Sequence, residues 1–260
     1  MSIQPKKHLG QHFLKDQNTC RKIVDQYTNF KGANNVLEIG PGMGAITQYF
    51  LQLENIQLEL MEVDRDSVAY LATNYPQLQG KIHEEDFLKT DLSTFFDGNP
   101  FAVVGNFPYN ISSQILFKCI EYRNQIPEIM GMFQKEVAER VAEPPGSKKY
   151  GILSVLLQTY YDIEYCFTVN ENVFDPPPKV KSGVIRCFRN QRMKLPVDEI
   201  LYKRIIKATF NQRRKTVRNG LKMLMDVKML PDHPLLKQRA EKLSVDDFIE
   251  LTHLVENSRT

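Results

Sequence analysis

The residues from 106 to 110, Asn-Phe-Pro-Tyr-Asn, place an amide, two aromatic rings and a proline directly after the apolar run 101–105. The side-chain carbonyl of Asn106 can accept a hydrogen bond from an exocyclic amine. The residue before Pro108 is held extended, which directs the carbonyl of Phe107 toward the same amine. The ring of Tyr109 can then stack on the face of a base. The pattern predicts a site for a flat ligand that carries an amine, and a simple turn that ends a strand is the alternative.

Two acceptors for one amine indicate a particular reaction. The lone pair of the amino group of adenine is delocalised into the ring, so this amine is a poor nucleophile. Acceptors on its hydrogens help to localise the pair while the nitrogen attacks the methyl carbon of a sulfonium. Positioning and electrostatics supply most of the catalysis in such a site, and no strong base is required.

A glycine-rich turn forms the second candidate constellation. Residues 36–47, Val-Leu-Glu-Ile-Gly-Pro-Gly-Met-Gly-Ala-Ile-Thr, predict a strand, a tight turn and a helix. Gly40, Gly42 and Gly44 let the backbone turn and approach a ligand closely. Glu62 ends the next strand, where nucleotide-binding sheets of this type place a carboxylate on ribose hydroxyls. A purely structural loop is the alternative, and the position of Glu62 argues against it.

The spacing of the glycines limits which nucleotide is expected. They follow the pattern GxGxG rather than GxGxxG, and no Walker lysine comes after them. Asp86 follows a predicted third strand at His83 and can accept a hydrogen bond from the amino group of adenine. We therefore expect an adenosyl ligand without a pyrophosphate, and S-adenosylmethionine fits best. A helix N-cap is the alternative for Asp86.

A proline-rich segment forms the third constellation. Residues 172–186 contain three consecutive prolines, which make a rigid extended stretch and fix the direction of the preceding Phe174. An aromatic ring opposite Tyr109 would complete a sandwich for a base extruded from a structured nucleic acid. A core phenylalanine that anchors a loop is the alternative for Phe174.

The elements that must position these residues alternate between short apolar strands and helical segments. The expected strands are 36–39, 57–62, 101–105 and 128–133, and two further runs at 161–169 and 183–189 are expected to close the sheet as an antiparallel pair. This order predicts an α/β fold with a Rossmann-like, mainly parallel sheet and helices on both faces. A helix whose charges mostly face solvent is expected at 134–141. Amphipathic helices are expected at 201–224 and 246–255, within a small all-helical domain. We therefore expect a methyltransferase domain at 1–190 and a helical domain at 191–260.

The composition limits the class of protein but does not indicate a function. Apolar residues make up 42% of the chain and charged residues 25%, as in an ordinary globular protein, and the formal net charge is +3. The four cysteines form no CxxC pair, so neither a zinc site nor a disulfide framework is expected. No secretory signal or membrane-spanning stretch is visible, which favours a cytoplasmic protein without a membrane partner.

Basic residues concentrate in the predicted helical hairpin near the C-terminus. They include Arg213, Arg214, Lys215 and Arg218. We expect these side chains to contact phosphates and to anchor the protein on RNA, and a solvated basic helix is the alternative. Lys6 and Lys7 form a short basic arm that is expected to close over the cofactor.

The motifs together resemble the ribosomal RNA adenine dimethyltransferase family, and the resemblance covers essentially the whole chain. It is carried by these stretches: GQHFL, LEIGPGMGAIT, EVDRD, EDFL, GNFPYN, QKEVAERV, YGILSV, VFDPPPKVKSG and FNQRRKTVRN. The resemblance is greatest to the small-subunit branch. It implies dimethylation of two adjacent adenosines near the 3′ end of small-subunit RNA, with S-adenosylmethionine as donor, no metal, and a monomer that meets the small ribosomal subunit.

The resemblance also implies a set of contacts to the cofactor. These would come from His12, Leu14, Gly40, Gly42, Glu62, Asp86 and Asn106. The chain departs from the family at two positions, because the family usually has Asn at the position of His12 and Leu at the position of Phe107. The imidazole of His12 can still donate a hydrogen bond, and Phe107 keeps its backbone carbonyl.

Three other functions stay open from the sequence. A large-subunit RNA methyltransferase that confers antibiotic resistance would share the first two constellations. A DNA adenine methyltransferase would also use an Asn-x-Pro-Tyr site, although no target-recognition domain is visible. A non-catalytic assembly or transcription factor could retain the same fold.

Overall fold

The computed structural model describes residues 4–6 and 9–258. The chain forms two compact units, Met1–Glu139 with Asp162–Arg189 and Arg140–Tyr161 with Asn190–Thr260. The second unit therefore includes residues 140–161, which the division at residue 190 assigns to the first domain. An RNA-binding role for residues 191–260 stays a prediction.

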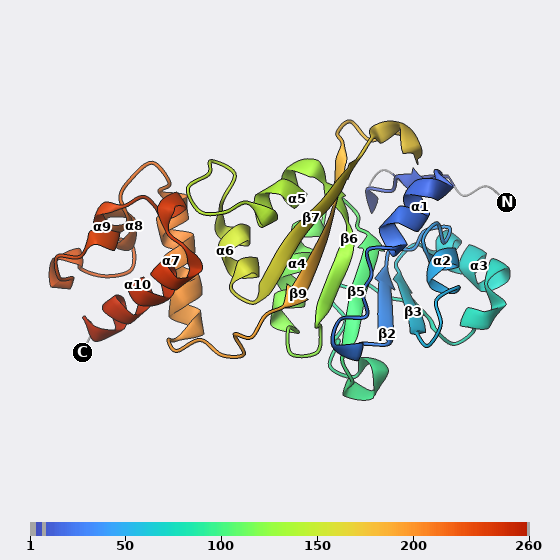
Figure 1. Cartoon of the computed structure of the whole chain (residues 1–260), viewed down its shortest axis with the longest axis horizontal. Coiled ribbons are helices and arrows are strands. Elements are labelled where there is room, and N and C mark those ends of the chain that lie inside the picture. Colours follow the sequence, from blue (N-terminus) through green and yellow to red (C-terminus); the bar gives the residue numbers. More distant parts are fainter. Residues whose placement is uncertain (1–3, 7–8, 259–260) are drawn as a thin grey trace. The chain divides into compact units, whose positions relative to one another are not determined.

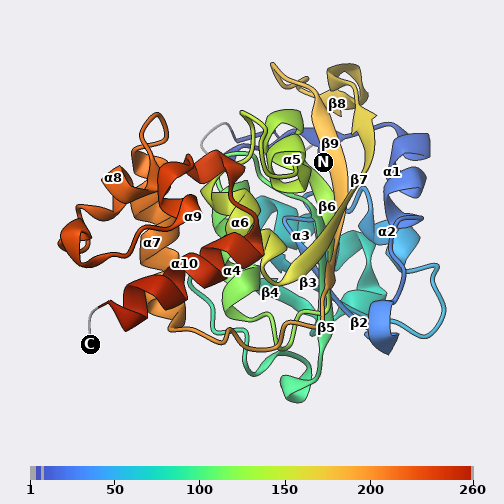
Figure 2. The same ribbon diagram turned by 60° about the vertical axis from the view of Figure 1, so that its left-hand side comes forward.

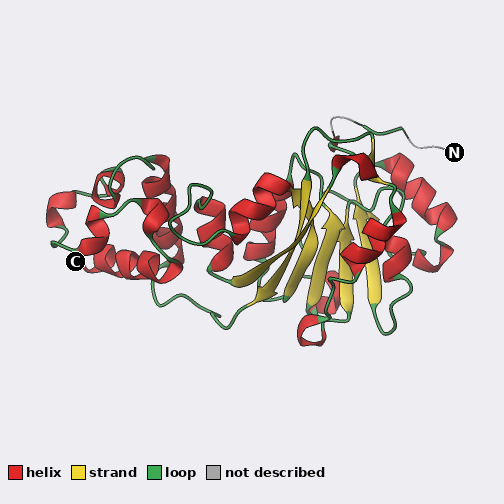
Figure 3. Ribbon diagram, turned by 45° about the horizontal axis from the view of Figure 1, so that its top comes forward, coloured by secondary structure: helices red, strands yellow, loops and turns green. Residues whose placement is uncertain are grey.

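The first unit contains a seven-stranded sheet with the order β4-β3-β2-β5-β6-β9-β7 (Figure 1). Its strands are β2 (Asn35–Ile39), β3 (Gln57–Glu62), β4 (Ile82–Glu84), β5 (Phe101–Asn106), β6 (Glu128–Gln134), β7 (Tyr161–Val169) and β9 (Ser182–Arg189). The pairs from β4 to β6 are parallel, and β9 runs antiparallel to β6. The predicted mainly parallel α/β sheet is confirmed, and Figure 3 shows its strands side by side.

A second, two-stranded sheet joins two distant parts of the first unit. Strand β1 (Phe13–Leu14) pairs antiparallel with β8 (Phe174–Asp175), so that Leu14 lies opposite Phe174. The backbone N–H of Lys15 also donates to the carbonyl of Val173 at 2.9 Å. The N-terminal arm, by which we mean the described residues 4–6 and 9–16, is thus tied to the proline-rich segment.

The helices of the first unit cover both faces of the sheet. They are α1 (Gln17–Val24), α2 (Thr47–Phe50), α3 (Arg65–Asn74), α4 (Ser112–Glu121) and α5 (Lys135–Ala142), which continues into the second unit. Helices α1, α2 and α3 share one hydrophobic cluster with residues of β2, β3, β5 and β6, such as Val36, Leu60 and Val104. Helix α4 lies on the other side of the sheet from α1 and α2 (Figure 2).

Two glycines in the middle of the sheet make room for Phe107. Gly105 and Gly131 lie opposite each other on β5 and β6. A Cβ atom on Gly131 would lie 2.3 Å from the carbonyl oxygen of Gly105 and 2.4 Å from the ring of Phe107. The ring of Phe107 is buried and lies 4.8 Å from that of Phe133, measured between centroids. The side chain at position 107 is therefore a packing residue that seats the motif on the sheet.

The second unit is helical. It contains α6 (Ile152–Gln158), α7 (Glu199–Asn211), α8 (Val217–Leu221), α9 (Pro234–Lys237) and α10 (Val245–Asn257). Helix α7 packs against α6, α8 and α10. Short 3-10 turns complete both units at Phe30–Gly32, Pro76–Leu78, Phe95–Gly98, Glu171–Val173, Val227–Met229 and Ala240–Lys242.

The helical hairpin expected within 201–224 consists of two helices, because α7 ends at Asn211, α8 begins at Val217, and residues 212–216 lie between them. The side chain of Thr209 in the last turn of α7 hydrogen-bonds to the carbonyls of Ile205 and Ile206, and the backbone then turns toward α8. The predicted helices at 134–141 and 246–255 are confirmed as α5 and α10.

Within residues 4–6 and 9–258, no helix is long and apolar enough to cross a membrane.

Candidate active site

The glycine turn after β2 is held in place by the carboxylate of Glu62 at the end of β3. Its Oε2 accepts a hydrogen bond from the N–H of Gly42 at 3.1 Å, and its Oε1 accepts from the N–H groups of Val63 and Asp64 at 2.8 and 2.9 Å. Burial raises the pKa of Glu62, although these three hydrogen bonds act in the opposite direction. The predicted cofactor residues Gly42 and Glu62 are therefore in direct contact.

The turn itself requires glycine at two predicted positions. Gly40 and Gly42 have φ angles of 64° and 58°, in the left-handed region. A Cβ on Gly42 would lie 3.0 Å from the ring of Phe13, and one on Gly40 would lie 3.5 Å from the ring of Pro108. The glycine turn therefore lies against both the N-terminal arm and the Asn-Phe-Pro-Tyr motif.

A second carboxylate lies buried beneath the same turn. The Oε2 atom of Glu38 accepts a hydrogen bond from the hydroxyl of Thr47 at 2.8 Å. Its Oε1 atom is buried and has no hydrogen-bond partner among the described residues. Burial raises the pKa of Glu38 to about 8, with a smaller contribution from the charge of Glu62, while the hydrogen bond from Thr47 lowers it. Glu38 is therefore largely protonated at neutral pH unless a cation comes close.

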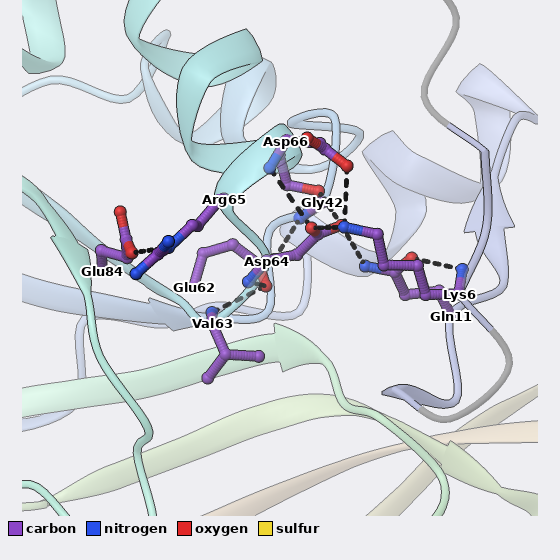
Figure 4. A network of polar contacts seen from close by, with 10 residues as sticks. Lys6, Gln11, Gly42, Glu62, Val63, Asp64, Arg65, Asp66 and Glu84 are labelled. Carbon is purple, nitrogen blue, oxygen red and sulfur yellow. Dashed lines mark hydrogen bonds and ion pairs between the residues drawn. The ribbon is translucent and has the colours of Figure 1, made fainter.

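The loop after β3 anchors the N-terminal arm (Figure 4). The ammonium of Lys6 pairs with the carboxylate of Asp64 and lies 2.7 Å from that of Asp66. Gln11 donates from Nε2 to Asp64 at 2.9 Å, and its Oε1 accepts from the N–H of Lys6 at 2.8 Å. Burial alone would raise the pKa of Asp64, but the hydrogen bonds from Gln11 and Lys6 lower it below its ordinary value. We call this set, Lys6, Gln11 and Asp64, the arm anchor.

The motif at the end of β5 meets the arm from the other side. The side-chain N–H of Asn106 donates to the carbonyl of His12 at 3.2 Å. The ring of Tyr109 stacks on that of His12, with 5.6 Å between centroids and 29° between planes. The hydroxyl of Tyr109 lies 2.5 Å from the hydroxyl of Ser182 on β9. Burial raises the pKa of Tyr109, opposed by that hydrogen bond.

Three predicted site residues have buried side chains. Phe107 packs on the sheet, and Leu14 and Phe174 belong to the hydrophobic cluster under α1 and α2. Only the main chain of these residues can reach a ligand in this conformation. The base-stacking role of Phe174 stays a prediction, and its present environment is that of an aromatic anchor for the arm and the proline-rich segment.

Asp86 begins a turn after β4. Its Oδ1 accepts from the N–H of Leu88 at 2.9 Å, and its carbonyl accepts from Lys89 and Thr90 at 2.9 and 3.0 Å. The buried Lys118 of α4 donates to the carbonyl of Thr90, and burial lowers the pKa of this lysine. Asp86 therefore shapes its own turn, and its contact with adenine stays a prediction.

The predicted RNA-binding residues fall into two groups, all within the second unit. Arg213 donates to Glu241 at 2.7 Å and to the carbonyls of Ser147 and Lys148. Arg218 donates to the carbonyls of Val227, Leu230 and Pro231 at 2.8 to 3.4 Å. Arg214 and Lys215, in contrast, are exposed. Arg213 and Arg218 thus hold loops together, while Arg214 and Lys215 present their charges to solvent.

Sequence reasoning missed several partners of the site. It did not assign Glu38, the contact of Asp64 with Lys6 and Gln11, or Ser182 as the partner of Tyr109. Asp64 belongs to the motif EVDRD, which is visible in the sequence, but its partner Lys6 lies 58 residues away in the chain. Lys7, which is predicted to act with Lys6, lies outside the described residues.

The fold and the site together define a class of protein. A parallel sheet with a glycine turn after β2, a carboxylate at the end of β3 and an Asn-Phe-Pro-Tyr motif after β5 is the arrangement of the Rossmann-like methyltransferases that use S-adenosylmethionine. Solved structures agree on the fold. A dimethyladenosine transferase from Plasmodium falciparum has a TM-score of 0.79 at 23% identity and covers 95% of this chain and 98% of its own. The 23S rRNA methyltransferase ErmE has a TM-score of 0.66 at 22% identity, over 93% and 99%.

Sequence comparison identifies the family within this class. Residues 3–257 match the ribosomal RNA adenine dimethylase family, and the chain belongs to it. Among curated relatives, the ribosomal RNA small subunit methyltransferase A of Parabacteroides distasonis is 56% identical, over 96% of this chain and 93% of the relative. The protein of the same name from Cytophaga hutchinsonii is 53% identical, over 97% and 98%. The predicted family, the methyltransferase activity and S-adenosylmethionine as donor are thereby confirmed.

We expect Glu38 to make stability depend on pH. Because its pKa is about 8 in the folded protein and 4.5 as the ordinary value, the folded state holds a proton that the unfolded state releases between these pH values. Stability therefore falls as pH rises through this window, by up to about 1.4 kcal/mol per pH unit. Glu38→Gln should remove that slope, measured by urea unfolding at pH 5, 6, 7 and 8.

The exposed Glu54→Gln is the matched control for Glu38→Gln. It should leave the pH slope of the wild type unchanged. Equal slopes in the wild type and in Glu38→Gln would contradict the assignment of a buried, protonated Glu38.

We expect Asp64→Asn to loosen the N-terminal arm. The substitution keeps the shape but removes the charge that Lys6 and Gln11 bind, and a hydrogen bond to a charged group contributes about 1.5–3 kcal/mol. Amide hydrogen exchange of residues 9–16 should accelerate by about 10-fold or more. Asp66→Asn is the control, because Asp66 pairs with the same Lys6 but its side chain is 66% exposed. Exchange equally fast in both variants would show that Asp64 is no special anchor.

Proposed function

We propose that this protein transfers methyl groups from S-adenosylmethionine to the exocyclic amines of two adjacent adenosines near the 3′ end of small-subunit ribosomal RNA. The products are dimethyladenosines formed during subunit maturation, and the proposal includes a cytoplasmic monomer that binds the small ribosomal subunit. The names of the relatives support the small subunit as the substrate. The contact of Asn106 with the carbonyl of His12, beside Tyr109, is the observation that carries the chemistry.

The residues around the glycine turn fit S-adenosylmethionine. The carboxylate of Glu62 uses three of its roughly four acceptor positions on backbone N–H groups, which leaves capacity for a ribose hydroxyl. The unpartnered Oε1 of Glu38 is a buried acceptor that a cationic ligand would stabilise. Gly40 and Gly42 would approach the ligand with their backbone, and Asp86 would accept from its adenine.

The arm would contribute main-chain groups to the same ligand. The side chain of Leu14 is buried, and the ring of His12 faces Tyr109. We therefore assign the predicted cofactor contacts of His12 and Leu14 to their backbones.

The geometry of Asn106 assigns roles in methyl transfer. Its N–H group donates to His12, so the side-chain oxygen Oδ1 is left as the acceptor for the amine of the target adenosine. The carbonyl of Phe107 would accept the second hydrogen of that amine, and Tyr109 would stack on the base. When bound, S-adenosylmethionine supplies the electrophilic methyl group on its sulfonium. The two acceptors raise the nucleophilicity of the amine, and no metal ion is needed because the reaction depends on positioning.

A direct assay tests the substrate. Labelled methyl transfer would be measured on unmethylated small subunits, protein-free large-subunit RNA and duplex DNA. We expect label in the small subunits alone, with paired reverse-transcription stops near the 3′ end, because dimethylation blocks the Watson–Crick edge. Label in large-subunit RNA would instead assign the protein to the resistance branch, and cofactor binding without any transfer would indicate a non-catalytic factor.

Asn106→Ala should lower the rate of methyl transfer by about 100-fold or more, because it removes an acceptor that acts on the reacting amine. The dissociation constant for small subunits should change by less than about threefold, since RNA affinity is dominated by phosphate contacts. Asn74→Ala is the control, as Asn74 caps the end of α3 with a hydrogen bond to Tyr70. Full activity of Asn106→Ala would exclude this residue from catalysis.

Arg214→Ala combined with Lys215→Ala should weaken RNA binding and reduce the slope of log affinity against log salt by about 1.5. Thermal stability should be unchanged, because both side chains are exposed. Arg213→Ala should instead lower stability, since it breaks contacts with Glu241 and the carbonyls of residues 147 and 148. A salt slope that is unchanged in the double variant would show that Arg214 and Lys215 do not bind RNA and belong to an ordinary solvated helix.

A further inference from the structure

His12 makes contact with two of the three predicted constellations at once. Its carbonyl accepts from Asn106 at 3.2 Å, and its ring stacks on Tyr109. Its Nδ1 lies 2.8 Å from the carbonyl oxygen of Pro176 in the proline-rich segment. A carbonyl can only accept, so Nδ1 carries the hydrogen. This residue departs from the usual Asn of the family, and it lies where the base is expected.

The ring of Tyr109 cannot easily move away from that of His12. Its hydroxyl is held at 2.5 Å by Ser182, which is fully buried on β9. The carbonyl of Tyr109 also accepts from the hydroxyl of Ser112 at 3.2 Å, at the start of α4. A base that stacks on the face of Tyr109 covered by His12 must therefore displace the imidazole rather than the tyrosine.

The imidazole shares properties with the base that Tyr109 is expected to bind. It is a flat aromatic ring, it lies against the face of Tyr109, and its N–H donates to a fixed backbone carbonyl. An adenine offers the same flat aromatic face with a larger ring, while its exocyclic amine would be bound by Asn106 and Phe107. Two groups contact the imidazole, the ring of Tyr109 and the carbonyl of Pro176, and of these Tyr109 would face the base.

The side chain of His12 can leave without moving the arm. The arm anchor fixes the adjacent Gln11 to Asp64, and β1 fixes Phe13 and Leu14 to β8. The hydrogen bond between His12 and Pro176 is exposed to solvent, so water replaces it when the ring rotates out. Rotation of one side chain therefore uncovers the stacking face while the backbone contact with Asn106 stays.

We propose that the imidazole of His12 is a placeholder for the target adenine, which covers Tyr109 until a base displaces it and so sets the threshold for base binding. This inference rests on the proposed function, because it takes Tyr109 as the stacking platform. A base must gain more binding free energy on Tyr109 than the imidazole loses when it leaves. This requirement favours a purine presented by its RNA over a free nucleoside. The placeholder thus makes His12 a specificity-determining residue.

Adenosine is the probe for the placeholder, with saturating S-adenosylhomocysteine added so that the cofactor site is filled. We expect His12→Ala and His12→Asn to bind adenosine about 2- to 12-fold more tightly than the wild type, which corresponds to the removal of one aromatic pair. The affinity for S-adenosylhomocysteine should stay within about twofold. His253→Asn, an exposed histidine on α10, is the matched control and should behave as the wild type.

Two results would overturn the placeholder. Adenosine affinity in His12→Ala that equals or falls below that of the wild type, or is too weak to measure, would show that the imidazole does not occupy the place of the base. A loss of S-adenosylhomocysteine affinity without a gain for adenosine would show that the side chain serves the cofactor instead.

Methyl transfer to unmethylated small subunits separates this inference from the proposed function. If the placeholder is correct, the Michaelis constant for subunits falls in His12→Asn. An active wild type with an unchanged Michaelis constant in the variant would refute the placeholder alone. A wild type that transfers no methyl group to small subunits would refute the proposed function, and the placeholder with it.

Discussion

The carboxylate of Glu62 is the interaction on which the rest of the site depends. A buried carboxylate without partners is costly, and this one is stabilised by three backbone N–H groups from two different loops. It therefore fixes the glycine turn after β2 relative to the loop after β3. Because adjacent parallel strands end at the same edge of the sheet, this one carboxylate holds together the two loops that carry the predicted cofactor residues Gly40, Gly42 and Glu62.

The position of the N-terminal arm follows from that constraint. Glu62 accepts from the N–H of Asp64 and so holds the backbone of that residue, and the Asp64 carboxylate in turn binds Lys6 and Gln11. The next residue in the chain, His12, contacts Asn106 and Tyr109, which are predicted to bind the base. Adjacent residues of the N-terminal arm thus contact the loop after β3 and the motif after β5.

The sequence predicts most of what local chemistry determines. The strand at 57–62 has the bounds expected from its apolar pattern, and the glycines at 40 and 42 have the left-handed φ angles that only glycine adopts readily. Patterns of apolar residues and glycines report local backbone preferences, which is why these features are visible in advance.

Features that depend on distant partners could not be predicted in the same way. A sequence shows that Phe174 precedes a rigid segment, but whether its ring faces a ligand or the core depends on the packing of Leu14 against it across β1 and β8. The basic residues 213–215 are predicted from the sequence to form one exposed surface. In the structure, however, Arg213 donates hydrogen bonds to carbonyls some 65 residues earlier in the chain. Likewise, nothing near Asp64 in the sequence indicates a partner at Lys6.

The composition of the helical unit bears on how such proteins can be rearranged in evolution. Residues 140–161 belong to this unit although the strands β7 and β9 separate them from its other helices in the chain. The hydroxyl of Thr159 lies 2.8 Å from that of Tyr202, and the N–H of Gly146 donates to the carbonyl of Glu241 at 2.6 Å. The C-terminal helices therefore do not form a separate unit without residues 140–161. A recombination event that exchanged only residues 191–260 would separate α6 from α7, so a new helical unit could be acquired only together with the matching residues 140–161.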